Sequence, residues 1–421
     1  MSISRRSLLK GIGTAAVVGV SQTLFPAWMP KLVFSPKAHA QPNRDVLVAI
    51  FQRGGMDGLS VVVPYGEGAN YYDRRPTIAI PEPTGSDRAA IDLNGFFGLH
   101  PSLLPLKEVY DAGALTIVHA AGSPDPTRSH FDAMEYMEKG IPGDKATSTG
   151  WINRYLQATA QQNDSPFRAV GMGTMMPASL RGPVSALTLK SISDFHLGGR
   201  DDQLANIQSI IARMYRIDAP TNLLETQAGS VYQTMDVLKA LNAVGYTPAN
   251  GAVYPESDFG MALRQVAQLI KAGVGLEVAC IDIGGWDTHE YQGSVDGEIA
   301  DLLRDLGAGL AAFHTDLGDT MSNVTVVSMS EFGRRVSENA SQGTDHGHGN
   351  VMFVMGGAST GQIYSDWPTL APEALVDGDL QITTDYRDVL SEIITKRLGS
   401  SALDHIFPGY TPYQRNIIAE R

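Results

Sequence analysis

The stretch that decides the fold runs from Val324 to Gly357: VTVVSMSEFGRRVSENASQGTDHGHGNVMFVMGG. Its first apolar run ends near Glu331, and its second covers Val351 to Met355. The glycine-rich loop between the two runs carries the letters DHGHG at 345–349. A carboxylate therefore stands at the tip of one predicted strand, and an Asp/His cluster stands on the loop that enters the next. Because α/β enzymes place ligands at such strand ends, the stretch predicts a metal-binding α/β fold.

A second stretch upstream follows the same pattern. At 280–292 the sequence CIDIGGWDTHEYQ runs as an apolar strand into Gly-Gly and then presents Asp287 and His289. The carboxyl ends of parallel strands meet at one edge of a sheet. We therefore expect this loop and the DHGHG loop to meet there.

The first predicted strand, Asp45 to Phe51, runs into the glycine-rich turn QRGGMDG, which contains Arg53 and Asp57. In an α/β enzyme such a turn can supply a first metal ligand or a phosphate cradle. Gly-Gly and Asp-Gly are also ordinary turn formers. Both interpretations of Asp57 stay open.

The segment PDPTRSHFD at 124–132 leads into a predicted helix that continues through Lys139. Ser129 could cap this helix or serve as an active-site hydroxyl. A hydroxyl at a helix N-terminus faces the positive end of the helix dipole, and Arg128 beside it makes this an anion-facing position. His130 could contact the substrate from the same place.

Apolar strands alternate with amphipathic helices along much of the chain. Asp258 to Ala272 has one apolar face and ends before a glycine, a strand follows at Leu276 to Ile283, and Ile299 to Leu317 is again an amphipathic helix. This βαβ rhythm predicts an α/β fold with a mostly parallel central sheet.

Two regions depart from this rhythm. Tyr71 to Asp92 is polar and proline-rich, so we expect it to run over the surface. Residues 150–250 read as a mostly helical insertion. We expect a helix from Trp151, a strand at Phe167 to Gly171, and helices at Asp201 to Arg216 and Leu223 to Ala243. This insertion could cap the site and set substrate choice, or it could be a structural buttress.

The composition limits the classes of partner. The chain has 421 residues, is 43% hydrophobic and carries a formal net charge of −13. Such acidity argues against nucleic acid or an anionic membrane as the main partner. A small anionic substrate is still compatible, because arginines and a metal can reverse the field within a pocket. The single cysteine, Cys280, excludes an intramolecular disulfide and is expected in the core.

The first forty residues read as a targeting signal. The sequence SRRSLLK at 4–10 has the twin-arginine pattern, a weakly apolar segment follows, and AHA at 38–40 fits cleavage after Ala40. The alternative is a membrane anchor, but the apolar run is too short and interrupted to span a bilayer. We expect a periplasmic or secreted protein, with 41–421 as one domain and the twin-arginine translocase as its partner during export.

Asp, Glu and His without sulfur ligands suit Zn²⁺ or Mn²⁺, with Mg²⁺ or Ca²⁺ as further options. One or two ions fit the two loops, and Glu331 could bridge them. Two cations would stabilise charge developing on a phosphoryl or sulfuryl group, and Arg334-Arg335 could contact an oxyanion. The alternative is that DHGHG is simply a polar loop.

The motifs FQRGGMDGLS, PDPTRSHFDAMEYMEKG, GGWDTHEYQ and SEFGRR…GTDHGHGNVMFVMGG, together with the twin-arginine leader, resemble the exported family DUF1501. That family is placed in the alkaline phosphatase/sulfatase-like superfamily. The resemblance implies an α/β/α sandwich with metal ligands on strand-end loops and a nucleophile that caps a helix. It also implies that Asp287 and His289 match the Asp/His pair of one metal, and that Ser129 lies near the nucleophile's position. Glu331 falls at a second-metal acid, and His346 or His348 at the late histidine.

This sequence departs from the superfamily pattern in four places. The first-strand aspartate is displaced to Asp57, and Glu331 is followed by Phe332 instead of a histidine. The Asp-His pair that does occur, Asp345-His346, comes later than expected, and no Cys-x-Pro-x-Arg signature is present. The second metal is therefore in doubt, and chemistry on a modified cysteine is not expected.

The sequence thus predicts an exported metal-dependent hydrolase of phosphate or sulfate esters. The alternative is a non-catalytic protein that binds a cell-envelope component and keeps at most one structural metal. The expected catalytic residues are Ser129, His130, Arg53, Arg128 and Arg334. The expected metal ligands or immediate neighbours are Asp287, His289, Glu331, Asp345, His346, His348 and Asp57.

Overall fold

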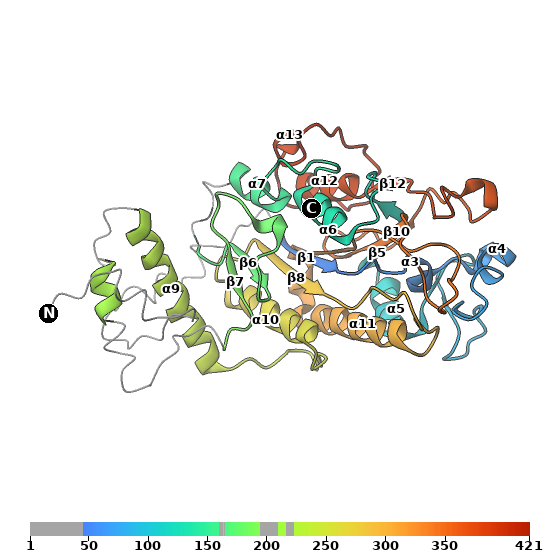
Figure 1. The fold of residues 1–421 in the computed structure, drawn as a ribbon. Helices are drawn as coiled ribbons and strands as arrows, with labels where there is room; N and C mark the ends of the chain where they lie inside the picture. The colour runs from blue at the N-terminus through green and yellow to red at the C-terminus, as the bar shows by residue number, and fades with distance from the viewer. Residues whose placement is uncertain (1–44, 160–162, 164, 194–208, 216–222) are drawn as a thin grey trace.

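The fold is taken from a computed structural model, which describes residues 45–421 except 160–162, 164, 194–208 and 216–222 (Figure 1). The predicted twin-arginine signal with its cleavage after Ala40 lies outside the described residues. So does most of the helix predicted at Asp201 to Arg216. None of the described helices is long and apolar enough to cross a membrane.

A nine-stranded sheet forms the centre of the molecule, in the order β11-β5-β10-β9-β1-β8-β6-β7, with β12 paired to β5. The pairings are parallel except those of β10, which runs antiparallel to β5 and β9. The predicted mostly parallel sheet is therefore confirmed. The strands are β1 Val46–Gln52, β5 Leu115–Gly122, β6 Ala169–Met172, β7 Leu187–Leu189, β8 Val278–Ile283, β9 Val324–Met329, β10 Asn350–Gly356, β11 Ile363–Tyr364 and β12 Thr384–Asp385.

The reversed direction of β10 decides where its loops lie. The loop that enters β10 begins where β9 ends, at the edge of the sheet that also holds the carboxyl ends of β1 and β8. A parallel β10 would have required a crossover, and its entering loop would have lain at the opposite edge. The antiparallel pairing therefore places the DHGHG loop beside the loop that follows β8.

Helices cover both faces of this sheet, as an α/β/α sandwich requires (Figure 1). On one face lie α5 Leu104–Asp111, α10 Asp258–Ala272 and α11 Glu298–Leu317. On the other lie α6 His130–Lys139, α7 Trp151–Ala158, α12 Tyr386–Lys396 and α13 Leu403–Ile406. The remaining elements include α3 Gly58–Val61, α4 Ala69–Tyr72, α9 Leu223–Val244 and a small sheet of β2 Val62–Val63, β4 Gly98–Leu99 and β3 Ile91–Asp92.

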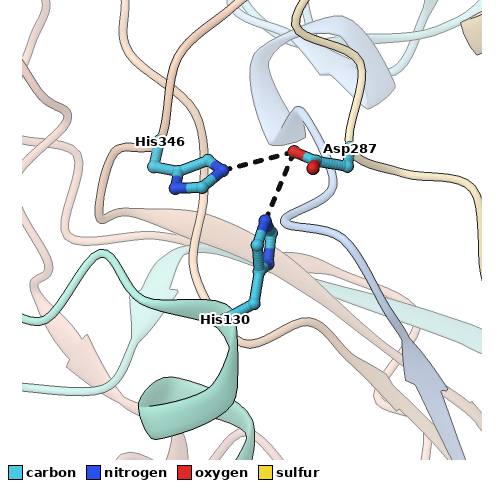
Figure 2. Close-up of side chains that lie close together, drawn as sticks. All are labelled: His130, Asp287 and His346. Atoms are coloured by element: carbon cyan, nitrogen blue, oxygen red, sulfur yellow. Dashed lines mark hydrogen bonds and ion pairs between the residues drawn. The ribbon is translucent and has the colours of Figure 1, made fainter.

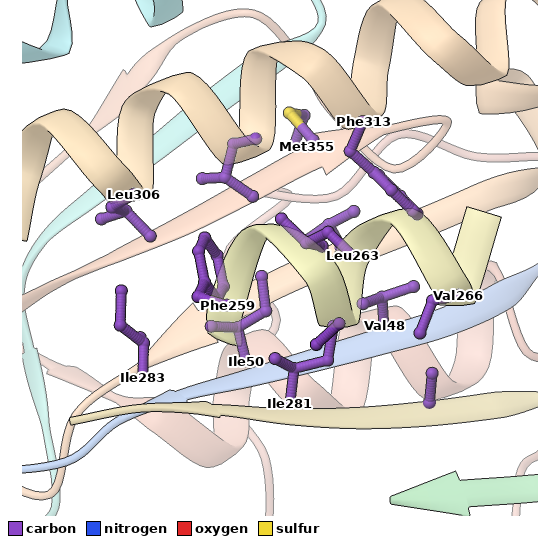
Figure 3. Close-up of a cluster of buried hydrophobic side chains, with 14 of the residues drawn as sticks. Val48, Ile50, Phe259, Leu263, Val266, Ile281, Ile283, Leu306, Phe313 and Met355 are labelled. Atoms are coloured by element: carbon purple, nitrogen blue, oxygen red, sulfur yellow. The ribbon is translucent and has the colours of Figure 1, made fainter. Parts of the chain in front are cut away.

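Helix α10 shows how the apolar pattern builds the core. Phe259, Leu263 and Val266 are buried in one cluster with Ile50 of β1 and Ile281 of β8 (Figure 3). Each such side chain contributes about 1.5–3 kcal/mol by leaving water. The Ser257 hydroxyl accepts a hydrogen bond from the Gly260 N–H at the start of the helix, and Gly273 ends it with φ +62°. The predicted bounds of this helix are confirmed.

Two expectations about the outer regions are wrong. The stretch Tyr71 to Asp92 is not a mere surface excursion, because Tyr71, Arg75 and Ile80 are completely buried. Residues 150–250 are not only an insertion: the strand predicted at Phe167 to Gly171 is present as β6, and β6 and β7 extend the central sheet beside β8. A short polar sequence can be buried when its few apolar and charged groups find partners elsewhere in the chain.

Candidate metal centre

Three side chains from distant parts of the chain meet at the carboxyl edge of the sheet (Figure 2). His130 is the first residue of α6, Asp287 follows β8, and His346 lies on the loop entering β10. Their nearest ligand atoms all lie within 4.8 Å of one another. The Asp287 Oδ1 atom is 3.3 Å from His130 Nε2 and 3.2 Å from His346 Nε2.

The outer nitrogens of the two rings fix their orientation. His130 Nδ1 lies 2.8 Å from Glu331 Oε1, and His346 Nδ1 lies 2.8 Å from the carbonyl oxygen of Arg128. Because both oxygens accept, each Nδ1 carries a proton, and in the neutral ring each Nε2 lone pair faces Asp287. His130 Nε2 is buried and has no hydrogen-bond partner among the described residues.

His289 stands at the outer side of this group. Its Nε2 is 3.0 Å from Asp287 Oδ1 and 2.9 Å from His346 Nε2. Its Nδ1 is 3.1 Å from Asp345 Oδ1, and that carboxylate also accepts from the Asn339 amide. His289 is therefore a fourth possible donor, and Asp345 lies behind it just as Glu331 lies behind His130.

Arg334 explains why these loops converge. Its side chain is buried, and its guanidinium donates to acceptors on three different loops instead of facing solvent. Arg334 is therefore a structural clamp at this rim, and the expectation that it contacts a substrate oxyanion is wrong. The acceptors are Asp287 Oδ1 at 2.7 Å and the carbonyl oxygens of Gly54, Gly55, Trp286 and Thr344.

The local charges keep Asp287 and His346 in forms that bind a cation, whereas His130 favours its protonated form. Burial alone would raise the pKa of Asp287, but the hydrogen bond from Arg334, the contact with His346 and the charge of Arg334 lower it to about 2. Burial lowers the pKa of His346, so its ring is neutral near pH 7. The hydrogen bond with Glu331 raises the pKa of His130 and stabilises its imidazolium, so a metal must displace that proton.

The donor set fits a divalent metal. Two imidazole nitrogens and one carboxylate suit Zn²⁺ or Mn²⁺ better than Mg²⁺ or Ca²⁺, which prefer oxygen ligands. A bound cation would also give the buried Nε2 of His130, which makes no hydrogen bond to any described residue, a direct partner. In the described part of the chain, these three residues are the group that could hold an ion, with His289 beside them.

The structure does not bring Asp57 into this group. Asp57 is completely buried, and its two oxygens accept from the Arg75 guanidinium at 2.5 and 3.0 Å. The Ser60 hydroxyl and the Gln292 amide donate to the same carboxylate. Burial opposes its charge, but Arg75 holds the pKa of Asp57 below its usual range. Both oxygens accept hydrogen bonds within the buried fold, so the expectation of a metal ligand is wrong here.

Three further expected site residues point elsewhere. His348 Nδ1 lies 3.1 Å from Asp379, whose hydrogen bond raises the pKa of this histidine, and Arg128 donates to the same carboxylate. Arg53 pairs with Glu138 and Asp282. These contacts direct Arg53, Arg128 and His348 away from the three donors, so none of them is placed at the candidate metal.

Ser129 is exposed at the N-cap position of α6, next to His130. Its side chain makes no capping hydrogen bond, so the interpretation as a simple cap is wrong. The sequence predicts His130 as a substrate contact, but the structure places it among the candidate metal ligands. Its position gives a signal for this, because a histidine that opens a helix at a sheet edge can face strand-end ligands.

Comparison with known proteins supports the motif-based assignment. A family described as Protein of unknown function (DUF1501) matches residues 112–395, which is most of the chain. The chain belongs to this family. No curated protein matches.

Several solved structures are similar in fold to this DUF1501 protein. The PsFucS1 sulfatase from Pseudoalteromonas sp. is 12% identical, with 86% of this chain and 75% of that chain covered and a TM-score of 0.34. The lipoteichoic acid synthase LtaP from Listeria monocytogenes is 9% identical, with 85% and 79% covered and a TM-score of 0.33. An alkaline phosphatase from the Antarctic bacterium TAB5 is 8% identical, with 77% and 95% covered and a TM-score of 0.30.

Proposed function

We propose that this protein is an exported metal-dependent hydrolase of phosphate or sulfate esters. The observation that carries the proposal is the meeting of His130, Asp287 and His346 at the carboxyl edge of the sheet, with their ligand atoms within 4.8 Å of one another. A divalent ion held by these residues would supply Lewis acidity toward the ester.

The chain's own residues would orient and protect that centre. Glu331 fixes the ring of His130, and Arg334 keeps Asp287 anionic and ties its loop to the β9–β10 loop. The donors come from three separate elements, and a buried clamp holds these elements together. Such support gives the precise geometry that hydrolysis requires.

Ser129 is the candidate nucleophile. Its hydroxyl is exposed beside His130 at the N-terminus of α6, a ten-residue helix whose positive dipole end favours an anionic group. A water molecule remains the alternative nucleophile.

Export is part of the proposal. It rests on the twin-arginine pattern at 4–10 and on the AHA sequence before position 41. Transport of an already folded chain would allow the metal to be acquired before export.

One observation favours a second candidate function, a non-catalytic protein that binds a cell-envelope component. All three arginines expected to contact a substrate contact carboxylates or carbonyls of the chain itself, although Arg128 keeps unused donors. These arginines are Arg53, Arg128 and Arg334. In that case the ion would only brace the loops, as structural metals do.

A metal-replete hydrolysis screen over phosphomonoesters, phosphodiesters and sulfate esters tests the proposal. The variant is Asp287→Asn, and the matched control is Asp404→Asn, which changes an exposed aspartate on α13. We expect activity in the wild type and the control and a loss of at least about 100-fold in Asp287→Asn. Ester turnover that survives Asp287→Asn would sink the assignment, and a metal-loaded wild type without turnover would favour the binding protein. Ser129→Ala then separates a serine nucleophile, where turnover is lost, from a water.

A further inference from the structure

A second polar cluster lies beside the candidate metal centre, around the buried carboxylate of Asp379. Arg128 Nη2 is 2.5 Å from Asp379 Oδ2, and Arg335 Nε is 3.9 Å from the other oxygen. His348 Nδ1 completes the contacts at 3.1 Å. The backbones of Arg335 and Asp379 form an antiparallel bridge, so these positions are tied together.

This cluster has more positive charge than its carboxylate can neutralise. Both guanidinium groups stay charged at any pH of interest, but they share the single carboxylate of Asp379. The other nearby carboxylate, Asp345, already accepts hydrogen bonds from His289 and Asn339. The charge of Arg335 is therefore balanced at a distance, by Asp379 at 3.9 Å and by the field of Asp345, whose pKa it lowers.

The two arginines also have unused donors. The Arg335 side chain is 39% exposed, and no hydrogen bond joins its guanidinium to any residue in the described part of the chain. The Arg128 side chain is 34% exposed, and its Nε is buried without a hydrogen-bond partner among those residues. Two partly exposed guanidinium groups that lie against one buried carboxylate and keep unused donors can bind an oxyanion.

The cluster is close to the metal donors but distinct from them. The carbonyl oxygen of Arg128 accepts from His346 Nδ1 at 2.8 Å, and His130 follows Arg128 by two residues. The guanidinium of Arg128 nevertheless reaches Asp379 and not Asp287. The segment from Arg128 to His130 therefore contributes His130 to the candidate metal centre and the charged guanidinium of Arg128 to the cluster around Asp379.

We propose that Arg128 and Arg335 form an oxyanion-binding subsite next to the metal donors. Building on the proposed function, the substrate then carries two anionic groups, the ester at His130, Asp287 and His346 and a phosphate, sulfate or carboxylate at the arginines. The chain carries a net charge of −13, so a doubly anionic molecule needs such a local reversal of the field to bind.

The first experiment measures anion binding without any hydrolysis. Metal-stripped full-length protein is titrated calorimetrically with sulfate, phosphate and acetate at constant ionic strength. The variant is Arg335→Met, which removes no hydrogen bond within the described chain. The matched control is Arg304→Met, because Arg304 is an exposed arginine of α11 that also pairs with an aspartate, Asp301.

We expect Arg335→Met to weaken binding of the best of these anions by roughly tenfold or more, and Arg335→Lys to restore part of it. Arg304→Met should bind like the wild type. No measurable binding by the wild type, or equal binding by wild type and Arg335→Met, overturns the proposal.

A second measurement separates this subsite from the proposed function. With the metal-loaded enzyme, Arg335→Met should raise KM for an aryl phosphate bearing a carboxylate and leave KM for the unsubstituted aryl phosphate unchanged. Equal KM changes for the two esters would overturn the two-anion substrate. If the wild type hydrolyses neither ester yet binds anions through Arg335, the hydrolase fails and the subsite stands.

Discussion

Asp57 and Asp287 occupy equivalent places in the chain and have different environments. Each follows a glycine-rich turn at the end of a parallel strand, and each bonds to a buried arginine, Arg75 or Arg334. Around Asp57 both oxygens accept hydrogen bonds from the fold and the side chain is completely buried. Asp287 is half-exposed, and histidine nitrogens face its Oδ1.

The histidines differ in the same way. In the core, His119 donates from Nε2 to the Val62 carbonyl and accepts at Nδ1 from the Ala120 N–H. At the rim, His130 and His346 use Nδ1 for an acceptor and leave Nε2 facing Asp287. A polar side chain whose hydrogen bonds are all made within the fold stabilises the fold, whereas one that keeps a nitrogen lone pair available can bind a ligand.

The largest expected effect on stability comes from replacing Asp57, the buried aspartate of this pair. Asp57→Ala leaves the Arg75 charge buried without its partner, which should lower the free energy of unfolding by about 3–5 kcal/mol. Urea denaturation of the metal-free protein measures this loss. The molecules that remain folded should bind metal like the wild type. Weaker metal binding per folded molecule would show that Asp57 contributes to the metal centre.

The second prediction concerns pH. Burial lowers the pKa of His119 to about 4, while in the unfolded chain it is about 6.5. Between these values the unfolded state binds more protons, so the stabilising contribution is complete above about pH 6.5 and is lost as pH falls towards 4.

The wild type should therefore lose about 3 kcal/mol more than His119→Gln between pH 7 and pH 4. Glutamine keeps a donor for the Val62 carbonyl but does not titrate. Denaturation curves at several pH values give the two slopes, and parallel slopes would contradict a neutral, buried His119.

The smallest of the three expected effects concerns Glu331, which supports His130 at the carboxyl edge of the sheet. Glu331→Gln still offers an oxygen to His130 Nδ1 but removes the charge that supports the ring, so metal affinity should fall about 10–100-fold. Competition with a chelator measures the affinity. An unchanged affinity would mean that His130 is not a ligand, because a supporting carboxylate must act through the ring it orients.

Sequence patterns predicted the elements whose information is local. The apolar spacing of Asp258–Ala272 and the glycine after it define a whole helix, and the Gly-Gly ends of strands mark the ligand loops. The direction of β10 has no such signal, since an apolar run reads the same in both orientations.

The sequence also carries no local signal for the partners of the charged residues. Arg75 lies 18 residues from Asp57 in a polar, proline-rich stretch, and nothing in that stretch marks it as buried. Arg334 resembles an exposed substrate contact in sequence, but its acceptors are mostly backbone carbonyls, which any sequence supplies. Asp287 and His346 were predicted to meet because loops at one sheet edge converge, and the structure brings them together.

The most direct test of the account is the number of Zn²⁺ or Mn²⁺ ions that the purified protein binds in equilibrium dialysis. The comparison includes His130→Ala and, as the matched control, His405→Ala, which removes an exposed histidine of α13. We expect one ion per chain in the wild type and in His405→Ala, and at least about 100-fold weaker binding in His130→Ala. A wild type that binds no ion, or a His130→Ala variant that binds as tightly as the wild type, would contradict the proposed metal centre.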